Sequence, residues 1–462
     1  MKRISDLLQE LDQLSSSVAK TVKRSPSATV PPVPRARRSI HLGIDYGTAT
    51  SKMVLREYGP DGERAHIVFP SSNRGRLRDF RVPSAVCLEG GRLWFGAEAA
   101  ARQSLRDVKT WCSIKMRVAS PQEFHGLAAP LAEGITADDL ATLTIAYLLQ
   151  EGKRAADSVS RHYQTPPAFS FTLGVPMSEL DHSHLRGHFA DIAQRATHIV
   201  GRPAAPDLRL GIPVLEGWML VSEADDALRR GPASEARRWV RSEVEAALLW
   251  PYKSGDTEPG IYAAVDVGAG TTSAAFFEIA SRTAGNGSVP DARTAGFFGT
   301  TCLAPGADAV DQALVMFGNT SDPAAMRAKE NAVIARVGEF AVAGVVSQIC
   351  QTYALAFDRA WEKHPRPASW DGYRLLLTGG GSEIDIVRRK LSLRAGPKLR
   401  HSPQLVDAAA PSDLEREGFA AADLRHLTVA YGLSHYDARV PSITTPGDTA
   451  EVVLSEPDSA LP

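Results

Sequence analysis

A short apolar strand that ends in Asp-x-Gly occurs twice in this chain, and this repetition restricts the possible folds more than any other feature. The first copy leads into Asp45-x-Gly47 and the second, 221 residues later, into Asp266-x-Gly268; an apolar strand leaves each turn. Glycine lets the backbone approach a ligand closely, and successive N–H groups of such a turn can bind phosphate oxygens. An ordinary hairpin turn uses Asp and Gly in the same way, but two copies favour two related halves that close on one nucleotide.

Two further patterns fit a nucleotide site. A carboxylate such as Asp45 would repel phosphate directly, so we expect it to act through a hydrated magnesium ion. An apolar strand at residues 375–378 runs into Gly379-Gly380-Gly381-Ser382, where the missing side chains would let a flat base or ribose lie on the backbone. The glycine run is a weak signal alone, but the three turns in this order predict a nucleotide-binding protein.

The composition excludes several other classes. Short apolar strands alternate with longer amphipathic helices, which predicts a layered α/β protein, and 462 residues allow about two to four subdomains. The 52 basic and 53 acidic residues balance, so we expect no nucleic-acid partner. The four cysteines form no CxxC pair, which argues against a disulfide framework or a zinc site. The chain lacks a run of about 18 apolar residues and a signal peptide's apolar core, so we expect a cytoplasmic protein with no membrane partner.

The two ends differ from the body of the chain. Residues 1–24 place apolar side chains at helical spacing, which predicts an amphipathic helix, and residues 25–39 form a linker rich in Pro, Ser and Arg. This helix would either dock on a separate protein or pack on its own domain, and both interpretations stay open. Residues 438–462 are acidic and rich in Pro and Thr, and we expect them to be disordered.

The order of two Asp-x-Gly turns and a late glycine run resembles the superfamily of actin, sugar kinases and heat-shock ATPases. Within it, the chain is most similar to the nucleotide-binding domain of the seventy-kilodalton heat-shock chaperones (DnaK-type). The segments that carry this similarity are 82–86 with 95–99, 111–117, 174–176 with Arg186 and Phe189, 221–224 and 430–432. The resemblance covers residues 40–437 and implies an actin-like ATPase fold, in which two lobes of related mixed sheets, 40–223 and 224–437, surround a nucleotide cleft.

The resemblance also implies a role for each matching residue, with ATP and Mg²⁺ as cofactors. Lys115 would orient or polarise the attacking water, and Glu223, Asp266 and Thr271 would complete the catalytic set. Asp45, Glu223 and Asp266 would hold the magnesium ion, mostly through water. The residues that would bind the nucleotide are Asp45, Gly47, Thr48, Ala49, Thr50, Lys52, Gly268, Ala269, Gly270, Thr272, Arg327, Lys329, Glu330, Gly379, Gly380, Gly381 and Ser382.

The sequence departs from the family pattern at several positions. Ala269 stands where the family usually has the middle of three glycines, and Ser273 stands where it commonly has a second acidic residue near magnesium. Glu383 falls near the place of an arginine that stacks on adenine. These differences leave metal affinity and base preference open. About 25 residues follow His435, too few for the family's peptide-binding domain, so we do not expect a self-contained chaperone.

We therefore expect a slow, magnesium-dependent ATPase whose lobe closure acts as a nucleotide switch. A separate partner protein would read this switch, through residues 1–24. Three alternatives share the motifs: an actin-like filament-forming ATPase, a small-molecule kinase, and a protein that binds nucleotide without hydrolysing it. The segments around Lys115 and Glu223 favour the switch. Filament formation would need complementary faces that one sequence cannot show, and no catalytic base for a kinase stands out.

Overall fold

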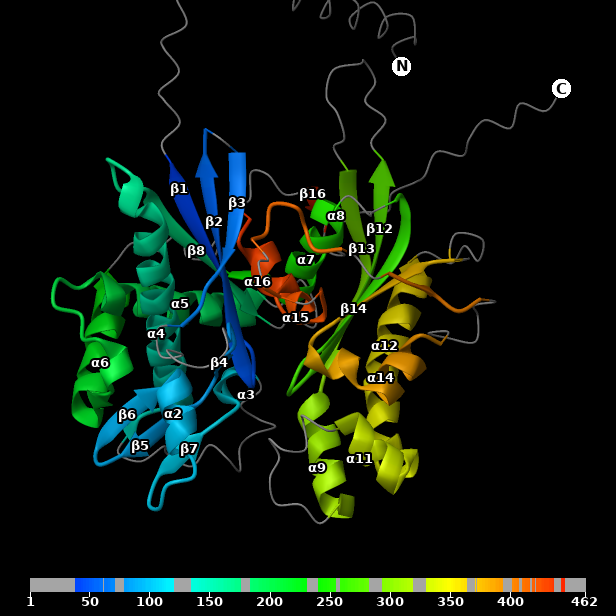
Figure 1. The fold of residues 1–462 in the computed structure, drawn as a ribbon, viewed down its shortest axis with the longest axis horizontal. Coiled ribbons are helices and arrows are strands. Elements are labelled where there is room, and N and C mark those ends of the chain that lie inside the picture. Colours follow the sequence, from blue (N-terminus) through cyan, green and yellow to red (C-terminus); the bar gives the residue numbers. More distant parts are fainter. Residues whose placement is uncertain are drawn as a thin grey trace, which may run out of the picture. The chain divides into compact units, whose positions relative to one another are not determined.

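The computed structural model shows a mixed α/β protein that contains two six-stranded sheets and a four-stranded sheet (Figure 1). The predicted helix at 1–24 lies outside the described residues, as do most of the linker at 25–39 and most of the tail at 438–462. The residues that the structure describes are 38–60, 62–70, 79–119, 134–175, 183–230, 240–254, 258–281, 293–318, 330–363, 370, 372–393, 401–406, 409–415, 418–419, 421–435 and 442–444.

The first large sheet carries the first Asp-x-Gly turn at the end of its central strand. Its strands are β1 Ser39–Asp45, β2 Thr50–Gly59, β3 Gly62–Ile67, β4 Val82–Pro83, β8 Ala168–Val175 and β10 Val240–Ser242. They follow the order β10-β8-β1-β2-β3, with β4 paired to β2. The hairpin partners β2 and β3 run antiparallel on one side of β1, and β8 and β10 run parallel on the other side.

The second large sheet repeats this order around the second turn. Its strands are β11 Gly260–Val267, β12 Thr272–Ser281, β13 Arg293–Leu303, β14 Arg374–Thr378, β15 Gln404–Leu405 and β16 Ser442–Thr444. The order β15-β14-β11-β12-β13 places antiparallel partners on one side of β11 and parallel partners on the other. β16 pairs with β13 at the edge. Three residues of the tail that we expected to be disordered therefore form a strand, because the open edge of β13 supplies backbone partners.

The repetition in the sequence is thus a repetition in topology. Asp45 lies opposite Lys52 in the first hairpin, and Asp266 lies opposite Ser273 in the second. On its parallel side, Asp266 is level with Thr378 of β14. Each aspartate therefore stands at the end of a central strand, where the chain turns back on itself.

Helices pack against each sheet (Figure 1). The strand predicted at 375–378 is confirmed within β14, and the other short strands that alternate with helices in the sequence, 40–44, 169–175 and 261–265, lie within β1, β8 and β11. Thr136 caps the helix that begins at Ala137, since it forms a capping box with Asp139. The helices that pack on the first sheet are α4 Ala137–Val159 and α5 Ser183–Gly201, and those on the second are α12 Ala343–Lys363 and α14 Asp385–Leu391.

Two short helices link the two large sheets, because each follows a strand of one sheet and packs against the other sheet. α7 Glu243–Ala247 follows β10 of the first sheet, yet its Val244 packs with Tyr262 of β11. In the reverse sense, α16 Thr428–Leu433 comes after the last long strand of the second sheet and packs against β1. The two helices also contact each other. The ends of β1 and β11 are held near one another by this exchange.

Glycine makes these close contacts possible. A Cβ atom on Gly43 of β1 would lie 2.2 Å from the carbonyl oxygen of Ala430, and one on Gly432 would lie 1.8 Å from the carbonyl oxygen of Ala246. Both distances are far inside van der Waals contact, so only a residue without a side chain fits. The segment 430–432, one of those that carry the family resemblance, is therefore part of the tight junction between α16 and α7.

The predicted boundary between lobes at 223 and 224 falls inside a helix. Residues on both sides of it belong to one continuous helix, α6 Val214–Arg230, which packs in the same core as the first sheet. β10 then adds to that sheet by pairing with β8. The part of the chain that builds the first sheet therefore runs to at least residue 242, because the pairing of β10 is a non-local contact that the local sequence does not announce.

The remaining elements complete the part of the chain that the structure describes. The four-stranded sheet is antiparallel, in the order β7-β5-β6-β9. No helix among the described residues is long and apolar enough to cross a membrane. The bounds are β5 Val86–Glu89, β6 Arg92–Phe95, β7 Lys109–Trp111, β9 Ile212–Pro213, α2 Gly96–Arg102, α3 Ile114–Ala119, α8 Leu249–Ser254, α9 Ala307–Gly318, α11 Glu330–Val337, α15 Ala421–Arg425, η4 Ser160–His162, η5 Leu208–Leu210, η7 Glu339–Ala341 and η8 Gly380–Glu383.

Candidate functional site

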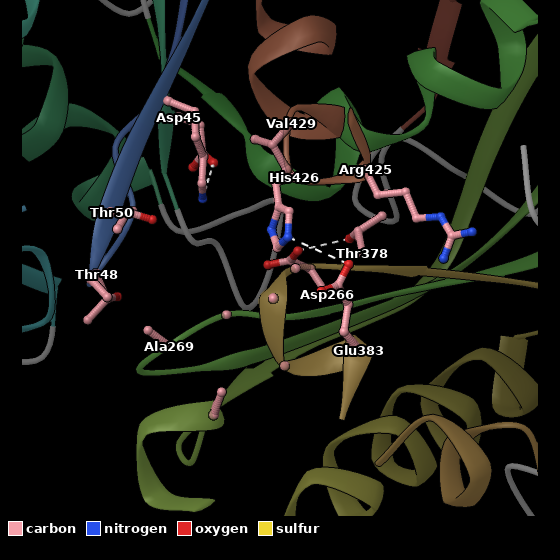
Figure 2. Close-up of a pocket in the computed structure, with 18 of the residues that line it drawn as sticks. Asp45, Thr48, Thr50, Asp266, Ala269, Thr378, Glu383, Arg425, His426 and Val429 are labelled. Atoms are coloured by element: carbon pink, nitrogen blue, oxygen red, sulfur yellow. Dashed lines mark hydrogen bonds and ion pairs between the residues drawn. The ribbon is translucent and has the colours of Figure 1, made fainter. Parts of the chain in front are cut away.

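A cavity of about 610 Å³ opens where the central strands of the two large sheets end. Figure 2 shows Asp45 and Thr48, from the first sheet, across this cavity from Asp266. The residues predicted from sequence that line it are Asp45, Gly47, Thr48, Ala49, Thr50, Lys52, Lys115, Asp266, Gly268, Ala269, Thr271, Gly379, Gly380 and Gly381. The lining residues that were not predicted are Arg81, Glu243, Ala307, Asn331, Ala332, Thr378, Glu383, Arg425, His426, Thr428 and Val429.

The two Asp-x-Gly turns touch each other at the floor of this cavity. A Cβ atom on Gly270 would lie 2.9 Å from the Thr48 side chain, so the second turn fits against the first only because position 270 has no side chain. Gly47 is equally constrained, since a Cβ atom there would lie 2.1 Å from the carbonyl oxygen of Thr50. The two turns therefore present backbone and hydroxyl groups to one shared space, as a phosphate-binding site requires.

Carboxylates and ammonium groups meet at this end of the cavity. Lys115 of α3 forms a buried ion pair with Glu243, the first residue of α7. Lys52 Nζ lies 3.1 Å from Asp45 Oδ2. Asp266 has no ammonium partner among the described residues; its Oδ1 accepts a hydrogen bond of 2.8 Å from the Thr378 hydroxyl. Three carboxylates and two ammonium groups thus share one low-dielectric site.

Burial shifts the pKa values of these groups. Burial raises the pKa of Glu243. The negative charges of Asp45 and Asp266 raise this pKa further, whereas Lys115 lowers it. Burial also raises the pKa of Asp266, against the hydrogen bond from Thr378. For Lys52 burial alone would lower the pKa, but attraction to Asp45, then to Asp266 and Glu243, raises it overall. The site therefore holds Lys52 as a cation and makes Glu243 an unusually good proton acceptor.

The predicted site residue Glu223 is not in the cavity. It lies on the outer side of α6 with 49% of its side chain exposed, and it pairs with Arg202 at 2.8 Å. Glu243 takes the place that we assigned to it. Both residues occur in a Ser-Glu pair. They are separated by the non-local pairing of β10 with β8, which places Glu243 at the end of a strand of the first sheet.

Several other predicted residues lie near the cavity without lining it. The Ser382 hydroxyl donates to the carbonyl of Gly379 at 2.7 Å, and the Thr272 hydroxyl donates to the carbonyl of Pro305 at 2.9 Å, so both support turns of the wall. Arg327 and Lys329 lie outside the described residues, and nothing is described of the Glu330 side chain. The first turn of α11 nevertheless reaches the cavity through Asn331 and Ala332.

The end of the cavity away from the paired lysines is formed by a different set of polar groups. His426 Nε2 lies 3.6 Å from Glu383 Oε1 (Figure 2), and the nearby imidazole of His426 lowers the pKa of Glu383 against the effect of burial. A Cβ atom on Gly380 would lie 3.5 Å from this imidazole. Glu383 was noted in the sequence only as a departure from the family. Nothing in the sequence predicted Arg425 and His426 as site residues, apart from their position shortly before the segment 430–432.

The carboxylates fit a hydrated magnesium ion better than a directly bound metal. Within the described parts of the chain, no three His, Cys, Asp or Glu side chains are close enough to hold a metal ion. Magnesium, however, usually keeps several waters and binds through one or two carboxylates and the substrate phosphates. Asp45, Asp266 and Glu243 around one cavity are suited to hold such waters.

No protein-family model matches the chain, and a search of curated proteins finds no match. The function must therefore be inferred from the cavity and from the two sheets.

Proposed function

We propose that this protein binds and slowly hydrolyses ATP, using an actin-like ATPase fold of the heat-shock type. The observation that supports the proposal most is the convergence of two topologically equivalent sheets. Each presents an Asp-x-Gly turn to the same cavity, from the end of its central strand. Two ordinary hairpins would not need their turns to face one cavity, whereas two phosphate-binding turns that do so can hold a nucleoside triphosphate between them.

In this proposal the cavity is divided along its length. The phosphates lie against the turns at Gly47 and Gly268, with the hydroxyls of Thr48 and Thr271 as further donors. The nucleoside extends toward Gly379–Gly381 and the pair of Glu383 and His426. Bound Mg²⁺ would supply positive charge that neutralises the phosphate oxygens, and its water shell would lie among Asp45, Asp266 and Glu243.

The Lys115–Glu243 pair would carry the chemistry. The ammonium group of Lys115 can orient an attacking water and stabilise the negative charge that develops on the phosphoryl oxygens. The carboxylate of Glu243, whose pKa is raised by burial, can accept the proton of that water. In an ion pair the two groups hold each other in place. Slow turnover is expected, because the proton acceptor is partly neutralised by its own partner.

A switch function would follow if nucleotide binding changes how the two sheets are held. The junction at α7 and α16 is the route by which the sheets contact each other near the cavity. A separate protein would read the closed state. Residues 1–24 are our proposed docking segment, and they lie outside the described residues.

Steady-state release of inorganic phosphate from ATP tests the proposal. We expect magnesium-dependent turnover in the wild type and a loss of about 100-fold or more in Lys115→Ala and in Asp266→Asn. The matched controls are Lys109→Ala and Asp358→Asn, which change exposed residues of the same types. Tight ATP binding without turnover in the wild type would reduce the proposal to a nucleotide sensor. Equal activity in the site variants and the controls would refute the assigned site.

A further inference from the structure

The two Asp-x-Gly turns differ in the charges around their aspartates, although the strands that carry them have the same order in the two sheets. We propose that Lys52 serves as a fixed cation at Asp45, so that the magnesium dependence of nucleotide binding rests on Asp266 rather than on both aspartates. This inference rests on the proposed function, because it concerns how the same cavity would hold nucleotide and metal. It differs from a symmetrical site, in which both aspartates hold magnesium water.

The first half already contains its own counter-ion. Lys52 Nζ lies 3.1 Å from Asp45 Oδ2, and the side chains are only 16% and 10% exposed. The pair is fixed by the hairpin, since the two residues are direct cross-strand partners at the ends of β1 and β2. An ammonium group in this position neutralises the carboxylate at close range, and a hydrated dication gains less from a neutralised carboxylate than from a free one.

Among the described residues, the second half has no such cation beside its aspartate. Ser273 occupies the cross-strand position that matches Lys52, and Asp266 is instead bonded to the neutral hydroxyl of Thr378 at 2.8 Å. A hydroxyl orients a carboxylate without cancelling its charge. Asp266 is therefore left without a paired ammonium group among the described residues, and glycines 268 and 379 leave space around its two oxygens. This is the carboxylate to which a hydrated magnesium ion would be drawn.

The charge balance of the whole end agrees with one magnesium ion held on one side. Lys115 forms an ion pair with Glu243, and Lys52 forms one with Asp45. Of the three carboxylates, Asp266 is therefore the one without an ammonium partner among the described residues. The ammonium group of Lys52 is held against Asp45 at 3.1 Å by the pairing of β1 and β2. A built-in cation of this kind also attracts phosphate, and some nucleotide affinity should remain without metal.

The test is the magnesium dependence of ATP binding by the full chain, measured by isothermal titration calorimetry from excess chelator to saturating Mg²⁺. The variants are Asp45→Asn, Asp266→Asn, Lys52→Ser and the double variant Lys52→Ser with Asp45→Asn. Serine is the residue that the second sheet carries at the matching position. Lys52→Gln repeats the test with a longer side chain in case the serine variant does not fold, and thermal unfolding of each variant checks that it folds.

We expect Asp45→Asn to change the half-saturating magnesium concentration by less than about threefold, and Asp266→Asn to raise it by about 10-fold or more. Removing Lys52 should lower the affinity for ATP in chelator and free Asp45 for the metal. On that background Asp45→Asn should then shift the magnesium requirement by about 10-fold. Equal shifts for Asp45→Asn and Asp266→Asn in the presence of Lys52 would overturn this inference while ATP binding stands. No ATP binding by the wild type at any magnesium concentration would overturn the proposed function, and this inference with it.

Discussion

Replacing Lys115 by methionine should destabilise the protein, by an amount that depends on pH. The side chains of Lys115 and Glu243 are 4% and 8% exposed, and they form a direct ion pair. Removing one partner of a buried pair leaves the other as an unpaired charge, which costs about 3–5 kcal/mol in the free energy of unfolding. Methionine matches the length of the lysine stem, so loss of packing contributes little.

The pH dependence follows from the carboxyl group that remains. Burial, Asp45 and Asp266 raise the pKa of Glu243 above its ordinary value of 4.5, and Lys115 opposes the rise. Without Lys115 the folded pKa rises further. A carboxyl whose pKa is higher in the folded than in the unfolded state binds more protons when folded, so the free energy of unfolding falls as pH increases between the two values. We expect the full loss near about pH 9, and a smaller loss near about pH 6, where Glu243 is protonated.

The assay is urea denaturation of the nucleotide-free protein at both pH values, followed by circular dichroism. Lys109→Met is the control, because Lys109 is exposed on β7; its effect should stay within about 0.5 kcal/mol. A loss of the same size at both pH values would refute the charge reasoning. A loss no larger than that of the control would show that the buried pair does not contribute to stability.

Two further predictions test the junction of the sheets and the corrected site. Gly432→Ala should lower the free energy of unfolding by at least about 1–3 kcal/mol in urea denaturation, because its Cβ atom would lie 1.8 Å from the carbonyl oxygen of Ala246. The control is Gly187→Ala in α5, whose Cβ atom meets nothing within 4 Å and which should raise the free energy of unfolding by about 0.5–1 kcal/mol. Equal effects of the two substitutions would contradict the packing described. In the phosphate-release assay, Glu223→Gln should leave ATP turnover within about twofold of the wild type and Glu243→Gln should lower it by about 100-fold, whereas the reverse pattern would restore the assignment made from sequence.

The parts of the site that the sequence predicted are those encoded by local turns. Asp45, Asp266 and Gly379 each follow an apolar strand by one or two residues, so the turn and the strand direction together place them at a strand end. The repeated pattern added the prediction that both ends serve one ligand, and both ends line one cavity. These predictions needed no knowledge of which strands pair.

The parts that the sequence did not predict depend on non-local packing. Glu243 lines the cavity because β10 pairs with β8, whereas Glu223, in a similar local sequence, turns outward on α6. His426 is brought to Gly380 by the packing of segments some 45 positions apart. The edge strand β16 was missed for the same reason, since its partner β13 ends some 140 residues earlier.

Hydrogen–deuterium exchange of the wild-type protein, with and without magnesium and ATP, tests the central claim most directly. If two related halves close on one nucleotide, ATP should slow amide exchange in the turns at 45–50 and 266–271 and in the glycine run at 379–381 together. Protection of one Asp-x-Gly turn without the other, or of neither, would contradict the claim that both sheets serve a single nucleotide site.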